Sequence, residues 1–142
     1  MEGFYMRPTR VTPSVYFKPD VGILDMRGKS SPENPLKFFE FLNSNLRRFE
    51  KARFKDLSVN MAFDYFNTSS SKCIFNMFRI LDGMHHNGVN IKVNWYYERD
   101  DEDMFESGED LSFFFDFRFN FVMIDEIKIL GDCVEDQEKV AY

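Results

Sequence analysis

The sequence predicts a single α/β domain in which a mixed β-sheet carries its helices mainly on one face. Several short stretches alternate apolar and polar residues, as strands do, whereas two longer stretches repeat apolar residues every three or four positions, as amphipathic helices do. The two kinds of stretch alternate through the middle of the chain, which is typical of α/β proteins. A chain of 142 residues, 44% apolar and with 18 phenylalanines, suffices for one domain with a substantial core.

The first predicted elements are two short strands that form a hairpin. Val15 and Phe17 alternate with polar neighbours, and a proline–aspartate pair then gives a turn signal. The residues Ile23–Met26 predict a second strand that ends at Gly28. The two strands are close enough in sequence to pair with each other.

A helix is predicted to begin after Asn34. The side chain of Asn34 suits the N-cap, and Pro35 suits the first helical position, where a missing N–H is no loss. Arg47 and Arg48 follow near the C-terminal end, where positive charge is favourable. The apolar positions that recur at helical spacing are Leu36, Phe39, Leu42, Leu46 and Phe49.

The centre of the chain predicts a strand–helix–strand unit. Residues 57–65 and 89–97 alternate apolar and polar side chains, and apolar residues recur at helical spacing over 74–84. Asn87 and Gly88 provide the helix stop. Such a unit is expected to be a right-handed parallel crossover.

The alternation within these two strands bears on the two faces of the sheet. A parallel sheet covered on both faces has nearly continuous apolar strands. Because these strands alternate instead, we expect helices on one face only. The other face is then either a partner surface or simply solvated, and the sequence leaves both readings open.

The end of the chain is acidic. Acidic residues are dense over 98–110, where we expect a short acidic helix, and a further strand is predicted near Phe119, Phe121 and Met123. The predicted organisation is a flexible N-terminus over 1–10, a single domain over 11–130 and an acidic flexible tail over 131–142.

Charge and composition exclude several classes of function. The net charge is −6, which disfavours binding to nucleic acid or to an anionic membrane surface. No apolar run is long enough to span a bilayer, and the N-terminus lacks the apolar core of a signal peptide. Cys73 and Cys133 are far apart and read as free thiols in a reducing compartment. We therefore expect a cytoplasmic protein.

Common catalytic and metal-binding motifs are not found in the sequence. It contains no glycine-rich phosphate loop and no zinc-ligand spacing. His85 and His86 are adjacent, so they do not point the same way from a helix as an i, i+4 pair of ligands does. The contiguous acids near residue 101 lack the order of a calcium loop. We expect neither a metal nor a cofactor.

The most informative segment is the junction between the strand that ends near residue 65 and the following helix. It runs from Asp64 to Lys72 and holds four consecutive hydroxyl residues, Thr68, Ser69, Ser70 and Ser71. One reading is helix capping by Asn67 and these hydroxyls. The other is phosphorylation, because a helix N-terminus stabilises added negative charge. The residues alone leave both readings open.

This junction resembles the signature of the SiaC-like family of bacterial regulatory phosphoproteins. Three further segments agree in order and spacing, and together the match covers roughly residues 12–125. The matching segments are Asn67-Thr68-Ser69-Ser70 with Lys72; Pro13-Ser14-Val15 with Gly22-Ile23-Leu24; Ser31-Pro32-Glu33-Asn34; and Trp95-Tyr96-Tyr97 with Asp101-Glu102-Asp103-Met104 and Gly108-Glu109-Asp110. Position 71 departs from the pattern, because it is serine where an apolar residue is expected.

The resemblance implies a STAS-like fold and a non-enzymatic regulator. In this family a Ser/Thr kinase phosphorylates the protein and a PP2C-type phosphatase dephosphorylates it. The unphosphorylated form binds and activates a diguanylate cyclase, which raises cyclic di-GMP and favours biofilm. The implied acceptor here is Thr68, with Ser69, Ser70 and Ser71 as alternatives.

We expect the partner surface to include Asn67, Thr68, Ser69 and Lys72, with the acids Asp64 and Asp101. An alternative function is an anti-sigma-factor antagonist, whose partner would be an anti-sigma kinase. A third is a small acid–base enzyme that uses Asp64, Glu98 and Asp101 with His85.

Overall fold

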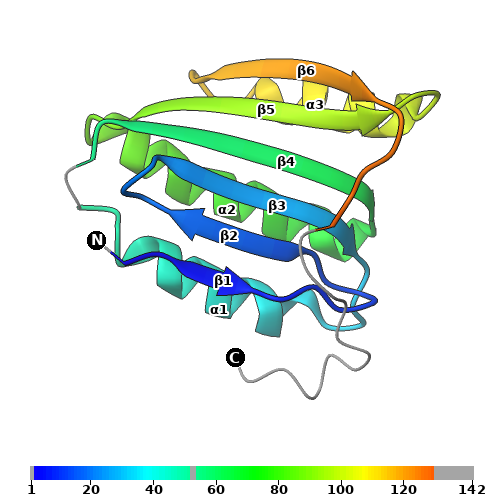
Figure 1. Cartoon of the computed structure of the whole chain (residues 1–142), viewed down its shortest axis with the longest axis horizontal. Coiled ribbons are helices and arrows are strands. Elements are labelled where there is room, and N and C mark those ends of the chain that lie inside the picture. The colour runs from blue at the N-terminus through cyan, green and yellow to red at the C-terminus, as the bar shows by residue number, and fades with distance from the viewer. Residues whose placement is uncertain (1, 52–53, 130–142) are drawn as a thin grey trace.

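The computed structural model describes residues 2–51 and 54–129. It is a six-stranded mixed sheet with three helices (Figure 1). The elements in chain order are β1 (Phe4–Met6), β2 (Ser14–Lys18), β3 (Ile23–Ser30), α1 (Pro35–Arg47), β4 (Asp56–Phe66), α2 (Thr68–His86), β5 (Asn90–Glu98), α3 (Glu102–Ser112) and β6 (Arg118–Ile124).

The strands lie side by side in the order in which they occur in the chain. β1, β2 and β3 pair antiparallel, and β3, β4, β5 and β6 pair parallel. The predicted hairpin and the predicted parallel strand–helix–strand unit are therefore confirmed. The three crossovers all step in the same direction, and crossovers of one hand then place their helices on one face.

The helices α1, α2 and α3 all lie behind the sheet in Figure 1, which confirms the expected one-sided arrangement. The core lies between the helices and that face of the sheet. Its largest completely enclosed side chains come from both layers, and they include Trp95 from β5, Phe63 from β4 and Phe78 from α2. The acidic segment forms α3, and the expected last strand is β6.

Strand β3 continues beyond the predicted end at Gly28. It runs to Ser30, with a register shift between Gly28 and Lys29 where it pairs with β4. Gly28 has a φ of 114°. A positive φ is easy for glycine, so the residue forms an irregularity within the strand rather than its end.

Helix α1 begins as predicted, with Asn34 as N-cap and Pro35 inside the first turn. Its buried stripe differs from the predicted one, because Pro35 and Phe38 are buried and Leu36 is 56% exposed. Leu36 lies about 100° around the helix axis from Pro35, which belongs to the buried stripe. It therefore faces the side of α1 rather than the sheet.

The expected loose N-terminus over 1–10 is corrected in part. Phe4–Met6 form strand β1, which pairs antiparallel with β2 along the edge of the sheet. Phe4 packs its ring against Phe17, with the ring centroids 5.4 Å apart. Pairing with β2 stabilises β1, because a strand of three residues is not stable by itself. The predicted acidic tail over 131–142 lies outside the described residues.

The uncovered face of the sheet carries a row of asparagine side chains. The Asn94 side chain donates to Asn60 Oδ1 at 2.9 Å, and the Asn120 side chain donates to Asn94 Oδ1 at 3.2 Å. These residues occupy one register across β4, β5 and β6. The amides therefore satisfy one another in part across the strands, which suits a face that no helix covers.

Candidate functional site

The candidate site is the start of α2, directly after β4. Asn67 is the N-cap, with φ −82° and ψ 172°, and its Oδ1 accepts a hydrogen bond from the backbone N–H of Ser70 at 2.9 Å. The backbone N–H of Asn67 donates to the carbonyl of Ser30 at 3.0 Å. The cap thus holds the helix start against the end of β3, as the capping interpretation predicts.

The four hydroxyl residues lie in different surroundings. Thr68 and Ser69 are exposed. Ser71 Oγ donates to the carbonyl of Thr68 at 2.6 Å, which keeps it within the helix. Ser70 is completely buried, and its Oγ accepts a hydrogen bond from Ser30 Oγ at 2.8 Å. A kinase therefore has no access to Ser70 in this fold, whereas Thr68 and Ser69 are accessible.

Thr68 lies at the mouth of a mostly apolar cavity of about 790 Å³. The first turns of α1 and α2 form its walls, so two helix N-termini face one space. Their partial positive charges and the exposed Lys72 favour negative charge there. The lining residues are Asn34, Pro35, Leu36, Asn67, Thr68, Ser69, Lys72, Cys73 and Asn76.

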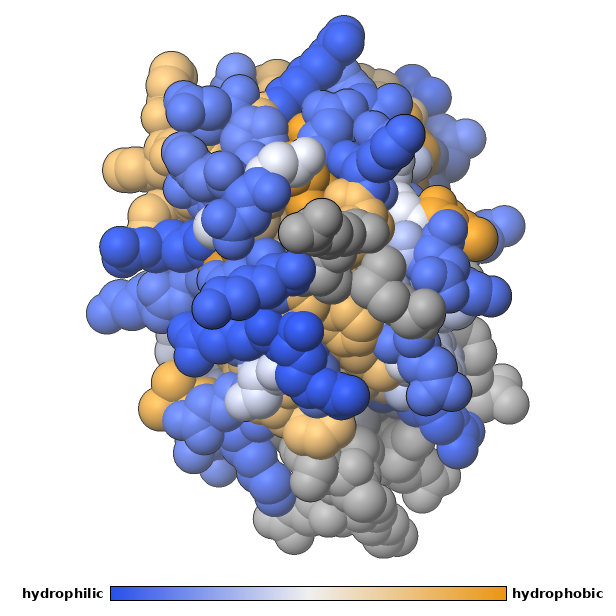
Figure 2. All heavy atoms as spheres, turned by 90° about the vertical axis from the view of Figure 1, so that its left-hand side faces the viewer, coloured by the Kyte–Doolittle hydropathy of each residue, from blue (hydrophilic) through white to orange (hydrophobic). Residues whose placement is uncertain are grey.

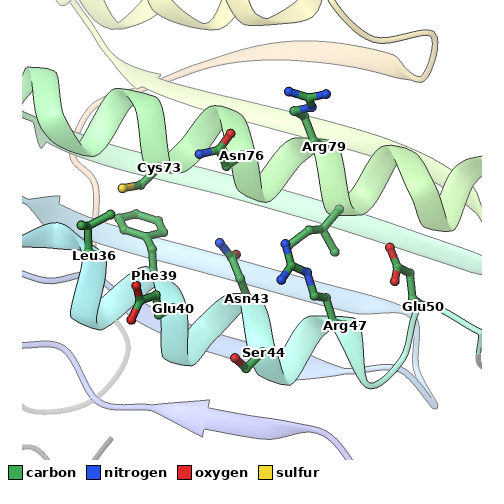
Figure 3. A pocket seen from close by; sticks show the side chains of 11 residues that line it. Leu36, Phe39, Glu40, Asn43, Ser44, Arg47, Glu50, Cys73, Asn76 and Arg79 are labelled. Carbon is green, nitrogen blue, oxygen red and sulfur yellow. The ribbon is translucent and has the colours of Figure 1, made fainter.

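A second cavity of about 520 Å³ continues between the same two helices. It shares Leu36, Cys73 and Asn76 with the first, and it extends toward the C-terminal end of α1. Figure 3 shows Asn43 and Arg47 reaching from α1 toward α2. We call the two cavities together the α1/α2 groove.

The end of the molecule at which the parallel strands β3–β6 begin has a largely hydrophilic surface (Figure 2). Thr68 lies at the other end, where β3 and β4 finish and where α1 and α2 start (Figure 1).

The structure brings together four of the six predicted partner-binding residues. Asn67, Thr68, Ser69 and Lys72 line one cavity, and neither acid is among its lining residues. Asp101 is the N-cap of α3, and its carboxylate accepts a hydrogen bond from the N–H of Met104 at 3.1 Å. Asp101 therefore has a structural role at another helix.

Asp64 shares the uncovered face of β4 with Asn60, because side chains alternate along a strand. Partial burial raises the pKa of the Asp64 carboxyl above its ordinary value, and the negative charge of Glu98 adds to this rise. Lys29 acts in the opposite direction. The acid is thus part of a charge cluster on the open face of the sheet, whereas the cavity lies on the helix side.

The residues of the acid–base hypothesis are not assembled into one site. Asp64 precedes the start of α2 and His85 lies at its end, and a helix of 19 residues is about 28 Å long. His85 Nδ1 lies 3.0 Å from the carbonyl of Val89, a local contact at the helix end. Among residues 2–51 and 54–129, no group of His, Cys, Asp and Glu is arranged to hold a metal ion.

Sequence reasoning missed the α1 side of the groove and the distal part of α2. Asn43, Arg47, Asn76 and Arg79 line the groove, but nothing local marks them. Lys72, Asn76 and Arg79 do follow an i, i+4, i+7 spacing, which places them along one side of α2. That spacing could have indicated a common surface.

No helix in the described part of the chain is long and apolar enough to cross a membrane.

Comparisons with known proteins agree with this architecture. The structure of apo-SiaC from Pseudomonas aeruginosa superposes with a TM-score of 0.76 at 26% identity, covering 86% of this chain and 99% of that chain. SiaC in the complex of the P. aeruginosa diguanylate cyclase SiaD with its activator SiaC gives a TM-score of 0.78 at 26% identity, covering 85% and 99%.

An uncharacterized protein of P. aeruginosa (strain UCBPP-PA14) is 28% identical over 110 residues, which cover 78% of this chain and 87% of that protein. The model of the SiaC family of regulatory phosphoproteins matches residues 6–124. That range takes in the sheet from the end of β1 to β6, all three helices and the start of α2, so the chain belongs to the SiaC family of regulatory phosphoproteins.

Proposed function

We propose that this protein is a non-enzymatic regulator whose phosphorylation at Thr68 controls its binding to, and activation of, a diguanylate cyclase. The observation that carries the proposal is the position of Thr68. Its side chain is exposed at the first position of α2, and its hydroxyl has no hydrogen bond with any residue in the described ranges. A kinase can therefore reach it without unfolding the helix.

The surroundings of Thr68 suit a phosphoryl group. The N-terminus of α2 attracts negative charge, and Lys72 lies one turn further along the same helix. A phosphoryl group adds roughly −1.5 to −2 units of charge near neutral pH. Modification is thus compatible with the folded helix, and its main effect falls on the surface around the cavity.

The consequence for binding follows from desolvation. A partner that packs over the mouth of the cavity would have to exclude water from the phosphate. Loss of one desolvated contact costs about 2–4 kcal/mol, which is more than tenfold in affinity. The unphosphorylated form is then the binding form.

The partners in this proposal are a Ser/Thr kinase, a PP2C-type phosphatase and a diguanylate cyclase in the cytoplasm. The cyclase is suggested by the complex in which SiaC of P. aeruginosa is the activator of SiaD. The STAS-like description of the fold and the link to biofilm remain predictions from family resemblance. No feature of the groove favours the anti-sigma-factor alternative.

The test compares two substitutions at Thr68 that differ in charge. Titration calorimetry would measure binding of the variants to SiaD, used as the probe cyclase. Thr68→Glu is expected to weaken binding at least tenfold, while Thr68→Ala binds like the unsubstituted protein. Unchanged affinity of Thr68→Glu, in a protein that itself binds SiaD, would overturn the proposal.

A second measurement locates the modification directly. Mass spectrometry of the protein isolated from its native cells is expected to find phosphate on Thr68 and none on the buried Ser70. Phosphate at Ser69 with an unmodified Thr68 would move the acceptor by one residue and contradict the assignment.

A further inference from the structure

We propose that the α1/α2 groove binds an amphipathic helix of the partner protein, one with an apolar face flanked by carboxylates. This inference rests on the proposed function, because it names the surface that phosphorylation at Thr68 controls. It goes further in assigning the groove walls, the class of occupant and the end at which the phosphate interferes.

The floor of the groove is apolar and lies between two helices. Phe39, Cys73 and Ile80 form it and are almost completely buried. Leu36 stands at the rim with 56% of its surface exposed, on the side of α1 that faces the groove. Two helical walls over an apolar floor are the geometry in which an amphipathic helix docks.

The length of the groove fits two to three helical turns. Its lining residues run along α1 from Leu36 to Arg47, which is about 16 Å at the rise of an α-helix. An extended strand would find no sheet edge to pair with between two helices. The walls therefore favour a helix as the occupant.

The charges along the groove favour an acidic occupant. Lys72, Arg79 and Arg47 line it, and none forms an ion pair with another residue of the described ranges. Glu40 and Glu50 also line it, so cations outnumber carboxylates in a chain whose net charge is −6. A locally positive strip on an acidic protein selects a partner surface with carboxylates.

The link to Thr68 is electrostatic. Thr68 and Lys72 line the same end of the groove, one helical turn apart. A phosphate on Thr68 would compete with the carboxylates of the docked helix for Lys72 and would repel them. The other end, at Arg47, would keep its affinity for acidic groups.

The test uses two synthetic helical peptides of about 18 residues, each with leucine along one face. One carries glutamate beside the leucines, and the other carries lysine at the same positions. Fluorescence anisotropy would measure their binding to the full chain. The glutamate peptide is expected to bind at least tenfold more tightly than the lysine peptide.

Two matched pairs of variants locate the binding surface. Arg47→Glu is expected to weaken binding of the glutamate peptide at least tenfold, whereas Arg48→Glu, which changes the same charge at a neighbouring exposed position outside the groove, does not. Leu36→Asp is expected to weaken it similarly. Its control is Val21→Asp, since Val21 is 57% exposed and lies in the turn between β2 and β3.

Several outcomes would overturn the groove assignment. These are no saturable binding of the glutamate peptide at millimolar concentration, equal affinity for both peptides, or equal effects of Arg47→Glu and Arg48→Glu. A fourth is a dimer of the free chain that Arg47→Glu dissolves in sedimentation, because a second copy would then be the occupant.

The same variants separate this inference from the proposed function. If Thr68→Glu abolishes binding to SiaD but Leu36→Asp and Arg47→Glu do not, the control by Thr68 stands and the groove assignment is wrong. If both groove variants weaken peptide binding and Thr68→Glu leaves SiaD binding unchanged, the groove stands and the proposed control by phosphorylation is wrong.

Discussion

The hydroxyl of Ser30 at the end of β3 donates a hydrogen bond to the hydroxyl of Ser70 in the first turn of α2, over 2.8 Å and out of contact with solvent. The two residues are 40 positions apart in the chain. Together with the bond from the Asn67 N–H to the Ser30 carbonyl, this contact fixes the position of Thr68 relative to the sheet.

The first prediction concerns this buried pair. Ser70→Ala removes the acceptor and leaves the Ser30 hydroxyl buried without a partner, so the free energy of unfolding should fall by about 1–3 kcal/mol. Urea denaturation measures the change. Thr68→Ala, at a nearby exposed position whose hydroxyl makes no hydrogen bond with the described residues, should stay within about 0.5 kcal/mol of the unsubstituted protein. Equal effects of the two substitutions would show that the buried bond contributes nothing.

The second prediction concerns the cap of α2. Asn67→Ala removes the Oδ1 that accepts from the Ser70 N–H, and it should cost about 1 kcal/mol of stability. Asn67→Asp keeps an oxygen at this position and should restore most of the loss, since a carboxylate also suits a helix N-terminus. Thermal unfolding of both variants provides the comparison, and an aspartate variant no more stable than the alanine variant would contradict it.

The third prediction concerns the packing of α3 on the sheet. A Cβ at Gly108 would lie 2.5 Å from Nε1 of Trp95, whose N–H donates to the carbonyl of Met104. Gly108→Ala should therefore destabilise the protein by about 1–3 kcal/mol through overpacking, although alanine is the better helix former.

Trp95 is the single tryptophan of the chain, so its fluorescence reports directly on this contact. The emission of Gly108→Ala should differ from that of the unsubstituted protein in the folded state. Glu109→Ala, at an exposed position of the same helix, should leave both emission and stability nearly unchanged. A Gly108→Ala protein of full stability would show that α3 shifts at no cost.

The fourth prediction is a pH dependence that arises from Asp64. Its pKa is raised above the ordinary value of 3.8, first by burial and then by Glu98, so the folded state holds this proton more tightly than the unfolded state does. This group's contribution to stability is therefore greatest at acidic pH and is lost as the pH rises through the raised pKa.

Asp64→Asn imitates the protonated form. The variant should be more stable than the unsubstituted protein near neutral pH, and the advantage should vanish at a pH well below 3.8, where the carboxyl is protonated in both states. Urea unfolding at a series of pH values gives this difference directly. A difference that is constant with pH would rule out titration of Asp64 as its cause.

The local rules of sequence were sufficient for the main elements. The alternation in β4 and β5 predicted both strands, because burial of one face enforces a period of two. Asn34 and Asn67 were both predicted near helix starts, since the capping oxygen acts on N–H groups only two or three residues away. Strand alternation and helix caps depend on residues that are close in the chain, so the sequence alone predicts them.

Features that depend on distant pairing were missed. Strand β1 is only three residues long, and it exists because β2 provides an edge for it. The irregularity at Gly28 depends on the register between β3 and β4. The groove walls were not predicted because helical spacing does not show which helix lies beside α2.

For the candidate site too, sequence proximity groups some residues correctly and one wrongly. Asn67, Thr68, Ser69 and Lys72 are near in sequence and line one cavity. Proximity in the sequence groups Asp64 with them, because it lies only four residues before Thr68. Strand alternation places it with Asn60 on the face away from the helices, and that signal was already present in the sequence.

The order of strands has a consequence for the emergence of the chain from the ribosome. The order in space equals the order of synthesis, so each new strand joins an edge that already exists and none must be inserted between earlier ones. The hairpin of β2 and β3 is available first, and β4, β5 and β6 can add to it one after another, each bringing its own helix. Thr68 can therefore take its place next to Ser30 as soon as β4 has docked, before β5 and β6 join the sheet.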